Sequence, residues 1–103
     1  MKNEVDKEYT LSLRVRKEDQ EPSLYQVVLE NDDFTPMEFV VGVLETFFYM
    51  SRRQATSIML EAHTKGTAIC GLYSRDLAES KISQVVDYAR MHDHPLRYRM
   101  EAA

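Results

Sequence analysis

The sequence predicts an α/β domain of the α+β type, in which a three-stranded antiparallel sheet carries three helices packed on one face. Residues 24–30, 67–73 and 96–101 are short apolar or alternating segments of the kind that form strands. The segments between them place apolar residues three and four positions apart, as amphipathic helices do. The order is strand, helix, helix, strand, helix, strand. A chain of 103 residues has room for one such core domain, residues 24–103, and a tail.

The first 23 residues are predicted to form a flexible N-terminal tail. Charges of both signs dominate this segment, and its only pattern is the alternation of Leu11, Leu13 and Val15 with polar residues. A single short strand of this kind is marginal in water, so we expect the tail to become ordered only on a partner. Pro22 and Ser23 mark its end.

The first strand and the loop after it are well marked. Tyr25, Val27 and Leu29 share one apolar face of residues 24–30. The polar residues 31–33 then break the strand, because their side chains bond to nearby backbone.

The first helix is predicted to begin at residues 35–38. Thr35 can cap it, Pro36 fits the first helical position, and Glu38 completes a capping box. Its buried stripe consists of Met37, Val40, Val41, Leu44, Phe47 and Phe48.

The second helix is predicted between a cap at Ser51, supported by Gln54, and an end at Gly66. Its inner face carries Ala55, Ile58, Met59 and Ala62. The strand 67–73 follows, with Gly71 as the expected position of a bulge or close approach.

The third helix is predicted to start at a cap on Ser74 and to end before Pro95, since the residue before a proline is pushed out of helical geometry. Its buried stripe is Ala78, Ile82, Val85, Val86 and Ala89. The last strand, 96–101, is one-sided, with Leu96, Tyr98 and Met100 on the apolar face.

Composition narrows the functional class. A net charge of −4 argues against a nucleic-acid partner, and no apolar run approaches the roughly 20 residues that span a membrane. The N-terminal segment lacks the apolar stretch of a signal peptide. Cys70 is the single cysteine, which precludes an intrachain disulfide and favours a reducing, cytoplasmic location. Because Cys70 lies in an apolar run, we expect it to be buried.

Three side chains could form an ammonium-binding site. Asn31, Asp32 and His63 can all accept hydrogen bonds, and a cation with three donors suits three acceptors. An apolar pocket beside them could come from Met37, Val40, Met59 and Leu96. Turn formation by residues 31–33 and a purely structural His63 remain open, so these residues permit such a site without requiring it.

Metal and cofactor sites find little support. The candidate metal ligands have no second cysteine and no His-x3-His on one helical face, so we expect no metal. They are Asp32, Asp33, His63, Cys70, His92 and His94. No glycine-rich phosphate loop is present, and we expect no cofactor.

Residues 31–40, NDDFTPMEFV, carry a specific resemblance. They resemble the ClpS adaptors of bacteria, whose hallmark is N-D-D-[YF]-T-P-M-[ED]-F-V. The likeness covers residues 24–102 nearly without a gap, and several motifs agree in order and spacing. These motifs are residues 55–63, 66–71, 78–81, 87–90 and 94–96.

The resemblance implies a non-enzymatic, monomeric adaptor. ClpS proteins bind N-terminal degradation signals, chiefly Leu, Phe, Tyr or Trp at the first position, and deliver them to the ClpA unfoldase of the ClpAP protease. The implied partners are therefore proteins with bulky hydrophobic N-termini and the N-terminal domain of a ClpA-type or ClpC-type AAA+ unfoldase. The sequence leaves open which unfoldase is used.

The resemblance also implies residue roles. Asn31, Asp32 and His63 match the positions that hold the substrate α-amine, and Asp33 and Thr35 match positions near the peptide backbone and pocket wall. The implied hydrophobic pocket is Met37, Val40, Met59, Ala62 and Leu96, with Met37 as the gate against β-branched residues. The implied unfoldase-docking residues are Asp76, Glu79 and Lys81, and the tail matches the segment used in hand-over.

The chain departs from the family pattern in places. Glu30 stands where the family often has an apolar residue, which would make the mouth of the site more acidic. Ala62 replaces a frequent Val and leaves extra volume near the pocket floor, while Asp76 replaces a frequent Glu.

Two other classes of function remain as alternatives. A ribosome-associated protein-interaction domain is one, since small folds of this kind also occur there, although the motif 31–38 argues against it. A hydrolase using Cys70 and His63 is the other, although no nucleophile motif supports it.

Overall fold

The computed structural model describes residues 24–103, and the predicted tail, residues 1–23, lies outside the described part. The element order matches the prediction. It is β1 (Tyr25–Glu30), α2 (Met37–Phe47), α3 (Arg52–Lys65), β2 (Thr67–Tyr73), α4 (Arg75–Met91) and β3 (Arg97–Ala102). None of the helices in residues 24–103 combines the length and apolar character needed to cross a membrane.

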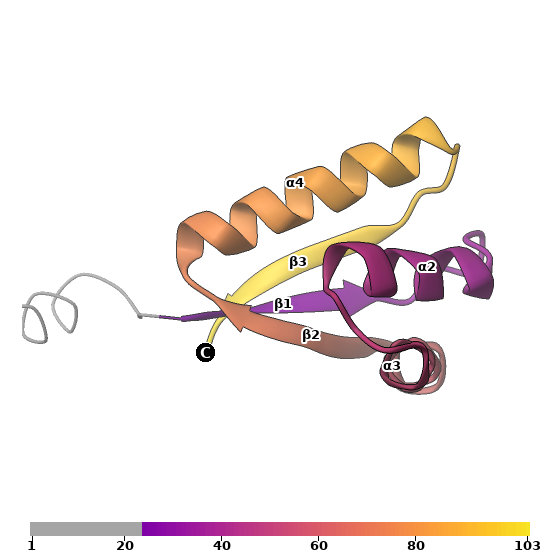
Figure 1. The fold of residues 1–103 in the computed structure, drawn as a ribbon, viewed down its shortest axis with the longest axis horizontal. Helices are drawn as coiled ribbons and strands as arrows, with labels where there is room; N and C mark the ends of the chain where they lie inside the picture. The colour runs from indigo at the N-terminus through magenta and orange to yellow at the C-terminus, as the bar shows by residue number, and fades with distance from the viewer. Residues whose placement is uncertain (1–23) are drawn as a thin grey trace, which may run out of the picture.

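The sheet has β1 at its centre, flanked by β2 and β3, and both neighbours run antiparallel to it (Figure 1). Glu30, the last residue of β1, lies opposite Thr67 of β2 and Arg97 of β3. The end of β1 and the beginnings of its two neighbours therefore meet at one end of the sheet. Figure 1 shows α2 and α3 near that end and α4 running along β3.

A bulge interrupts the pairing of β1 with β2, as predicted near Gly71. Val27 pairs with Gly71 and Val28 with Ile69, so Cys70 is the extra residue. A Cβ added at Gly71 would lie 2.9 Å from the ring of Tyr73, which explains why glycine suits this position.

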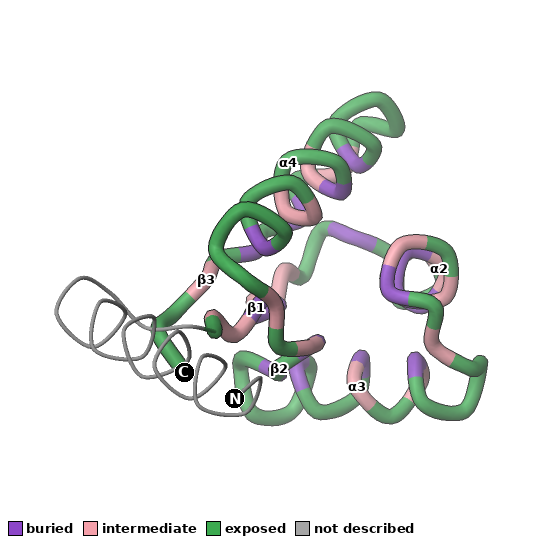
Figure 2. The backbone as a smooth tube through the Cα atoms, turned by 60° about the vertical axis from the view of Figure 1, so that its left-hand side comes forward, coloured by how far each residue is buried: buried purple, intermediate pink, exposed green. Residues whose placement is uncertain are grey.

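The core lies between one face of the sheet and the helices. Val27 and Leu29 of β1 are fully buried, and Figure 2 shows the buried residues on the helix sides that face inward. The buried part of the predicted helix stripes is Val40, Val41, Leu44, Phe48, Ala55, Met59, Ala62, Ala78, Val85 and Ala89. Met37 was predicted in this stripe, but it is 46% exposed because it sits in the first turn of α2, at the edge of the core.

Three of the predicted helix boundaries are confirmed in detail. The side chains of Ser51 and Ser74 accept hydrogen bonds from the N–H groups of Gln54 and Leu77. Gly66 ends α3 in the left-handed conformation, with φ of 95°, and its N–H donates to the carbonyl of Ala62.

The predicted capping box of the first helix is wrong. The helix begins at Met37, Pro36 occupies the cap position, and no side chain caps it. The hydroxyl of Thr35 donates to the Asp32 carboxylate instead, since a charged acceptor makes the stronger hydrogen bond. The carbonyl of Pro36 accepts the first backbone bonds, from Phe39 and Val40.

Candidate functional site

A cavity of about 250 Å³ opens at the end of the sheet where β1 finishes. The end of β1 and the loop after it, the first turns of α2, the second half of α3 and the residue before β3 all contribute to its wall. Every residue predicted for the amine site and the hydrophobic pocket lines it: Asn31, Asp32, Asp33, Thr35, Met37, Val40, Met59, Ala62, His63 and Leu96. Glu30, expected at the mouth, also lines the cavity, as do Leu29 and Pro36, for which no role in the site was predicted.

The inner wall of the cavity is apolar. Val40, Met59, Ala62 and Leu96 are at most 8% exposed. Val40 comes from α2, Met59 and Ala62 come from α3, and Leu96 directly precedes β3. Met37 also lines the cavity but remains half exposed, so it stands at the rim. An apolar side chain that entered would exchange water for this wall, which is favourable in proportion to the apolar area buried.

The loop that carries Asn31, Asp32 and Asp33 forms one side of the polar mouth of the cavity, and it is attached to the end of α3. The backbone N–H of Asn31 donates to the carbonyl of Gly66 over 2.9 Å, so the loop is anchored where α3 ends. The side-chain nitrogen of Asn31 donates to Asp33 Oδ1 over 3.3 Å. This bond uses the amide nitrogen and leaves the amide oxygen as an acceptor.

The Asp32 carboxylate is held by two hydrogen bonds from its own loop. Oδ1 accepts from the backbone N–H of Phe34 over 3.2 Å, and Oδ2 accepts from the hydroxyl of Thr35 over 2.5 Å. Each carboxylate oxygen has two lone pairs, so each can accept one bond more. The carboxylate is thus fixed in orientation while it keeps capacity for a donor from outside.

His63 completes the mouth from the side of α3. It lies one turn after Met59, and its side chain is exposed to solvent. Among the described residues, its imidazole has no hydrogen-bond partner. A neutral imidazole therefore has a ring nitrogen available as an acceptor.

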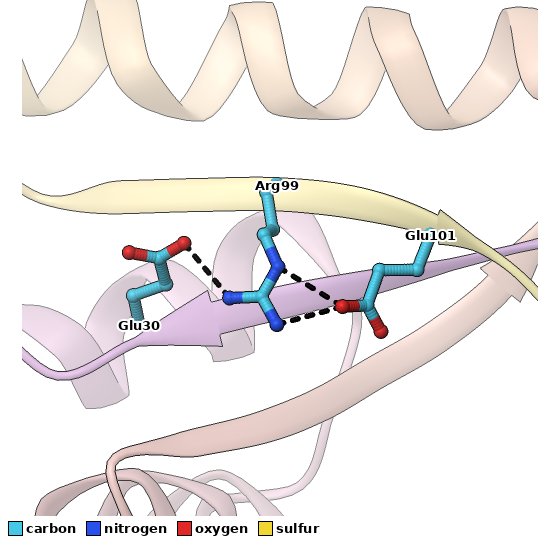
Figure 3. Close-up of polar contacts among 3 residues, drawn as sticks. All are labelled: Glu30, Arg99 and Glu101. Atoms are coloured by element: carbon cyan, nitrogen blue, oxygen red, sulfur yellow. Dashed lines mark hydrogen bonds and ion pairs between the residues drawn. The ribbon is translucent and has the colours of Figure 1, made fainter.

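Glu30 at the mouth is paired with Arg99. Figure 3 shows Glu30 accepting from Arg99 Nη1 over 2.9 Å, while Nε and Nη2 of Arg99 donate to Glu101 over 3.1 and 2.7 Å. Hydrogen bonds to Glu101 and Glu30 raise the pKa of the Arg99 guanidinium above its usual value. One positive charge is shared by two carboxylates, so Arg99 offsets only part of the extra acidity expected from Glu30.

The structure gives the hydrolase and metal alternatives no support. Burial raises the pKa of the Cys70 thiol to about 12, so very little thiolate exists near neutral pH. No group of three or more potential ligands gathers within residues 24–103. His92 and His94 instead pack on the ring of Phe39, at centroid distances of 5.5 and 4.4 Å.

The predicted docking residues lie in the first half of α4. Glu79 faces Arg75 at 3.9 Å, and Asp76 is in the first turn. Lys81 is not a free charge: its Nζ donates to the carbonyl of Phe47 over 2.5 Å and lies 4.7 Å from the Tyr49 ring. Lys81 therefore also satisfies a carbonyl at the C-terminus of α2.

Comparison with known proteins decides the family. The family model described as ATP-dependent Clp protease adaptor protein ClpS matches residues 20–99. This chain belongs to the ClpS family. It is 54% identical over 93 residues to the ATP-dependent Clp protease adapter protein ClpS of Hyphomonas neptunium, covering 90% of this chain and 79% of that one. Identity to the ClpS protein of Caulobacter vibrioides strain NA1000 is 55% over 87 residues, or 84% of this chain and 80% of that protein.

A solved structure agrees in fold. The structure of Agrobacterium tumefaciens ClpS2 bound to L-phenylalaninamide matches with a TM-score of 0.77 and 39% sequence identity. The match covers 80% of this chain and 99% of the other. The chain is thus an adaptor of the Clp protease with the ClpS fold.

Proposed function

We propose that this adaptor binds N-terminal degradation signals with Leu, Phe, Tyr or Trp at the first position and delivers their bearers to the ClpA unfoldase for degradation by ClpAP. The observation that carries the proposal is the placement of the acceptors Asn31, Asp32 and His63 at the mouth of an apolar cavity. L-phenylalaninamide, the ligand of the Agrobacterium relative, combines a free α-amine with an aromatic side chain. A cavity of this kind suits both groups.

The mouth recognises the α-ammonium group. The three N–H donors of this ammonium group match the amide oxygen of Asn31, the carboxylate of Asp32 and a ring nitrogen of His63. Hydrogen bonds that involve a charged group contribute about 1.5 to 3 kcal/mol each, and desolvation of the ammonium offsets part of that. An internal residue has no ammonium, so this term restricts binding to N-termini.

The cavity selects the first side chain. Burial of a Leu or Phe side chain contributes about 1.5 to 3 kcal/mol, and together with the ammonium term this is compatible with a Kd of about 1 μM. Met37 at the rim narrows the entrance, which disfavours a branch at the β-carbon. Asp33 and Thr35 line the same mouth and contact the beginning of the peptide backbone.

Delivery uses other parts of the chain. Asp76, Glu79 and Lys81 dock on the N-terminal domain of the unfoldase, and residues 1–23 engage the unfoldase during hand-over. Asp76, Glu79 and Lys81 do not line the cavity, so docking on the unfoldase is separable from capture of the N-terminus. The protein acts as a non-enzymatic, monomeric adaptor in the cytoplasm.

Degradation of a fluorescent reporter by reconstituted ClpAP tests the proposal. The full chain should accelerate degradation of a reporter that begins with Phe, and have little effect on the same reporter beginning with Gly. A chain lacking residues 1–20 should still bind the Phe reporter but fail to deliver it. Equal acceleration of both reporters would show that the first residue is not recognised.

A further inference from the structure

Two helices that contribute to the wall of the cavity, α2 and α3, are joined at the surface by one arginine. Arg52, the first residue of α3, donates from Nη2 to Glu38 Oε2 over 2.5 Å and from Nη1 to Glu45 Oε1 over 3.4 Å. Glu38 and Glu45 lie about two turns apart on α2. Because Glu38 directly follows Met37, the shorter bond reaches the turn that carries this rim residue.

The two halves of the first turn of α2 are held differently. Packing fixes the second half, since the Phe39 ring stacks on Tyr88 of α4 at a centroid distance of 5.6 Å and Val40 is buried. The first half, Met37 and Glu38, is exposed, and no side chain caps the helix. Within residues 24–103, the ion pair with α3 is the only polar side-chain contact of this first half.

The position of Arg52 is unfavourable for its own helix. The first turn of α3 carries Arg52 and Arg53 and no acidic residue, although the positive end of a helix dipole repels positive charge. Two carboxylates of α2 offset this for Arg52, whereas Arg53 has no ion pair with any described residue. Such a conflict between local preference and a long-range contact is expected where a residue serves a role outside its own helix.

The link between α2 and α3 bears on the width of the cavity. Met37 and Val40 line it from α2, and Met59, Ala62 and His63 line it from α3. Without the ion pair, the exposed first half of the turn is free to move away from α3, which widens the rim beside Met37. A ligand side chain branched at Cβ needs more room at the rim than an unbranched one, so widening favours Ile more than Leu.

We propose that Arg52 is a positioning residue for the specificity of the cavity: it holds Glu38, keeps Met37 close to α3 and thereby sharpens the discrimination between Leu and Ile at the first position. The inference rests on the proposed function, in which Met37 narrows the entrance. Both partners of the ion pair are exposed, so it contributes little to the free energy of unfolding and weakens as salt rises.

Fluorescence anisotropy with the full chain measures this discrimination. Two labelled peptides differ only in the first residue, Leu or Ile, and the readout is the ratio of their Kd values. Arg52→Gln should narrow the ratio by about two- to fivefold, the range expected for an exposed ion pair, through tighter binding of the Ile peptide. In about 0.5 M NaCl, the ratio of the unaltered chain should move toward that of the variant.

Matched variants assign the effect to the ion pair. Arg53→Gln removes the same charge from the same turn of α3 and should keep the ratio. Glu38→Gln should narrow the ratio as much as Arg52→Gln, and the two changes combined should narrow it no further, because both remove one interaction. Calorimetry should give similar Tm values for the two arginine variants, so a changed ratio reports on specificity and not on stability.

Three results would overturn the inference and leave recognition of the N-terminus standing. They are an unchanged ratio in Arg52→Gln, an equal narrowing in Arg53→Gln, and equal affinity of the unaltered chain for the Leu and Ile peptides. If N-acetylated and free Leu peptides bind alike, the proposed function itself fails.

Discussion

The hydroxyl of Thr35 donates a hydrogen bond to Asp32 Oδ2 over 2.5 Å, and this contact orients the carboxylate at the mouth of the cavity. Thr35 is a buried polar residue, 6% exposed, whereas Asp32 still reaches solvent. The bond therefore connects a buried donor in the protein interior to a carboxylate at the mouth of the cavity. It holds the acceptor in place before a ligand arrives, which lowers the entropic cost of binding.

Replacing Thr35 with Val removes the donor and keeps the shape, so we expect peptide affinity to fall. Without the bond, the Asp32 side chain must be ordered when the peptide binds, at a cost of about 0.5 to 1.5 kcal/mol, which corresponds to a loss of about two- to twelvefold. Thr35→Ser keeps the hydroxyl and should bind close to the original affinity. Equal affinity of the Val and Ser variants in anisotropy titrations would mean that the contact does not orient Asp32.

Met37→Ala should allow peptides with Ile or Val at the N-terminus to bind, because the Met37 side chain at the rim would no longer clash with a ligand side chain branched at Cβ. Met37 is 46% exposed, so the free energy of unfolding should change little. Leu44→Ala on the same helix is the contrast, since Leu44 is fully buried and its truncation should cost about 2 to 5 kcal/mol. Peptide titrations with Leu, Ile and Val, beside urea unfolding, measure both effects. Unchanged discrimination between Leu and Ile would place the gate elsewhere.

Much of the fold follows from local patterns. The helical stripes, the serine caps and Gly66 each depend on residues within a few positions of one another, so the sequence shows them directly. Boundaries are less well defined: the last strand was predicted at residues 96–101 and runs from Arg97 to Ala102. Strand ends depend on partner strands, which a local pattern does not contain.

In the candidate site, too, local motifs were predictable from the sequence and contacts between distant residues were not. The pocket residues were predicted from the motif at residues 31–40 and from the family resemblance that it carries. The structure places all of them around one cavity. Their roles in binding stay predictions. Two contacts could not be predicted from the sequence: Lys81 with Phe47, 34 residues apart, and Glu30 with Arg99, 69 residues apart. No periodic pattern signals an ion pair or a cap between such distant residues.

Lys81→Met should destabilise the domain, because it leaves the Phe47 carbonyl at the end of α2 without its donor. We expect a loss of about 1 kcal/mol and a lower Tm by calorimetry. Glu79→Gln, also in the proposed docking surface but well exposed, should leave Tm unchanged while it weakens unfoldase binding. An unaltered Tm in Lys81→Met would show that the contact with α2 contributes nothing to stability.

Cys70 should react slowly with a thiol reagent as long as the chain is folded. The unfolded thiol, with a pKa of about 9.0, gains thiolate steadily from pH 8 to 10, but burial raises the folded value to about 12. The raised pKa means that the folded protein keeps the proton across this range, so its reaction rate should stay far below that of the urea-unfolded chain. Because Cys70 is the only cysteine, mass spectrometry after timed alkylation reports on it alone. Fast alkylation of the folded protein at pH 8 would indicate an accessible, ionised thiol.

In the proposed mode of recognition, Asn31, Asp32 and His63 bind a free α-ammonium group while the cavity holds the first side chain. Fluorescence anisotropy with one peptide beginning with Phe, measured with its N-terminus free and then acetylated, tests this most directly. Acetylation removes the charge and two of the donors but keeps the side chain. We expect the free peptide to bind with a Kd of about 1 μM and acetylation to weaken binding by at least about a hundredfold. Equal affinity for the two peptides would contradict it.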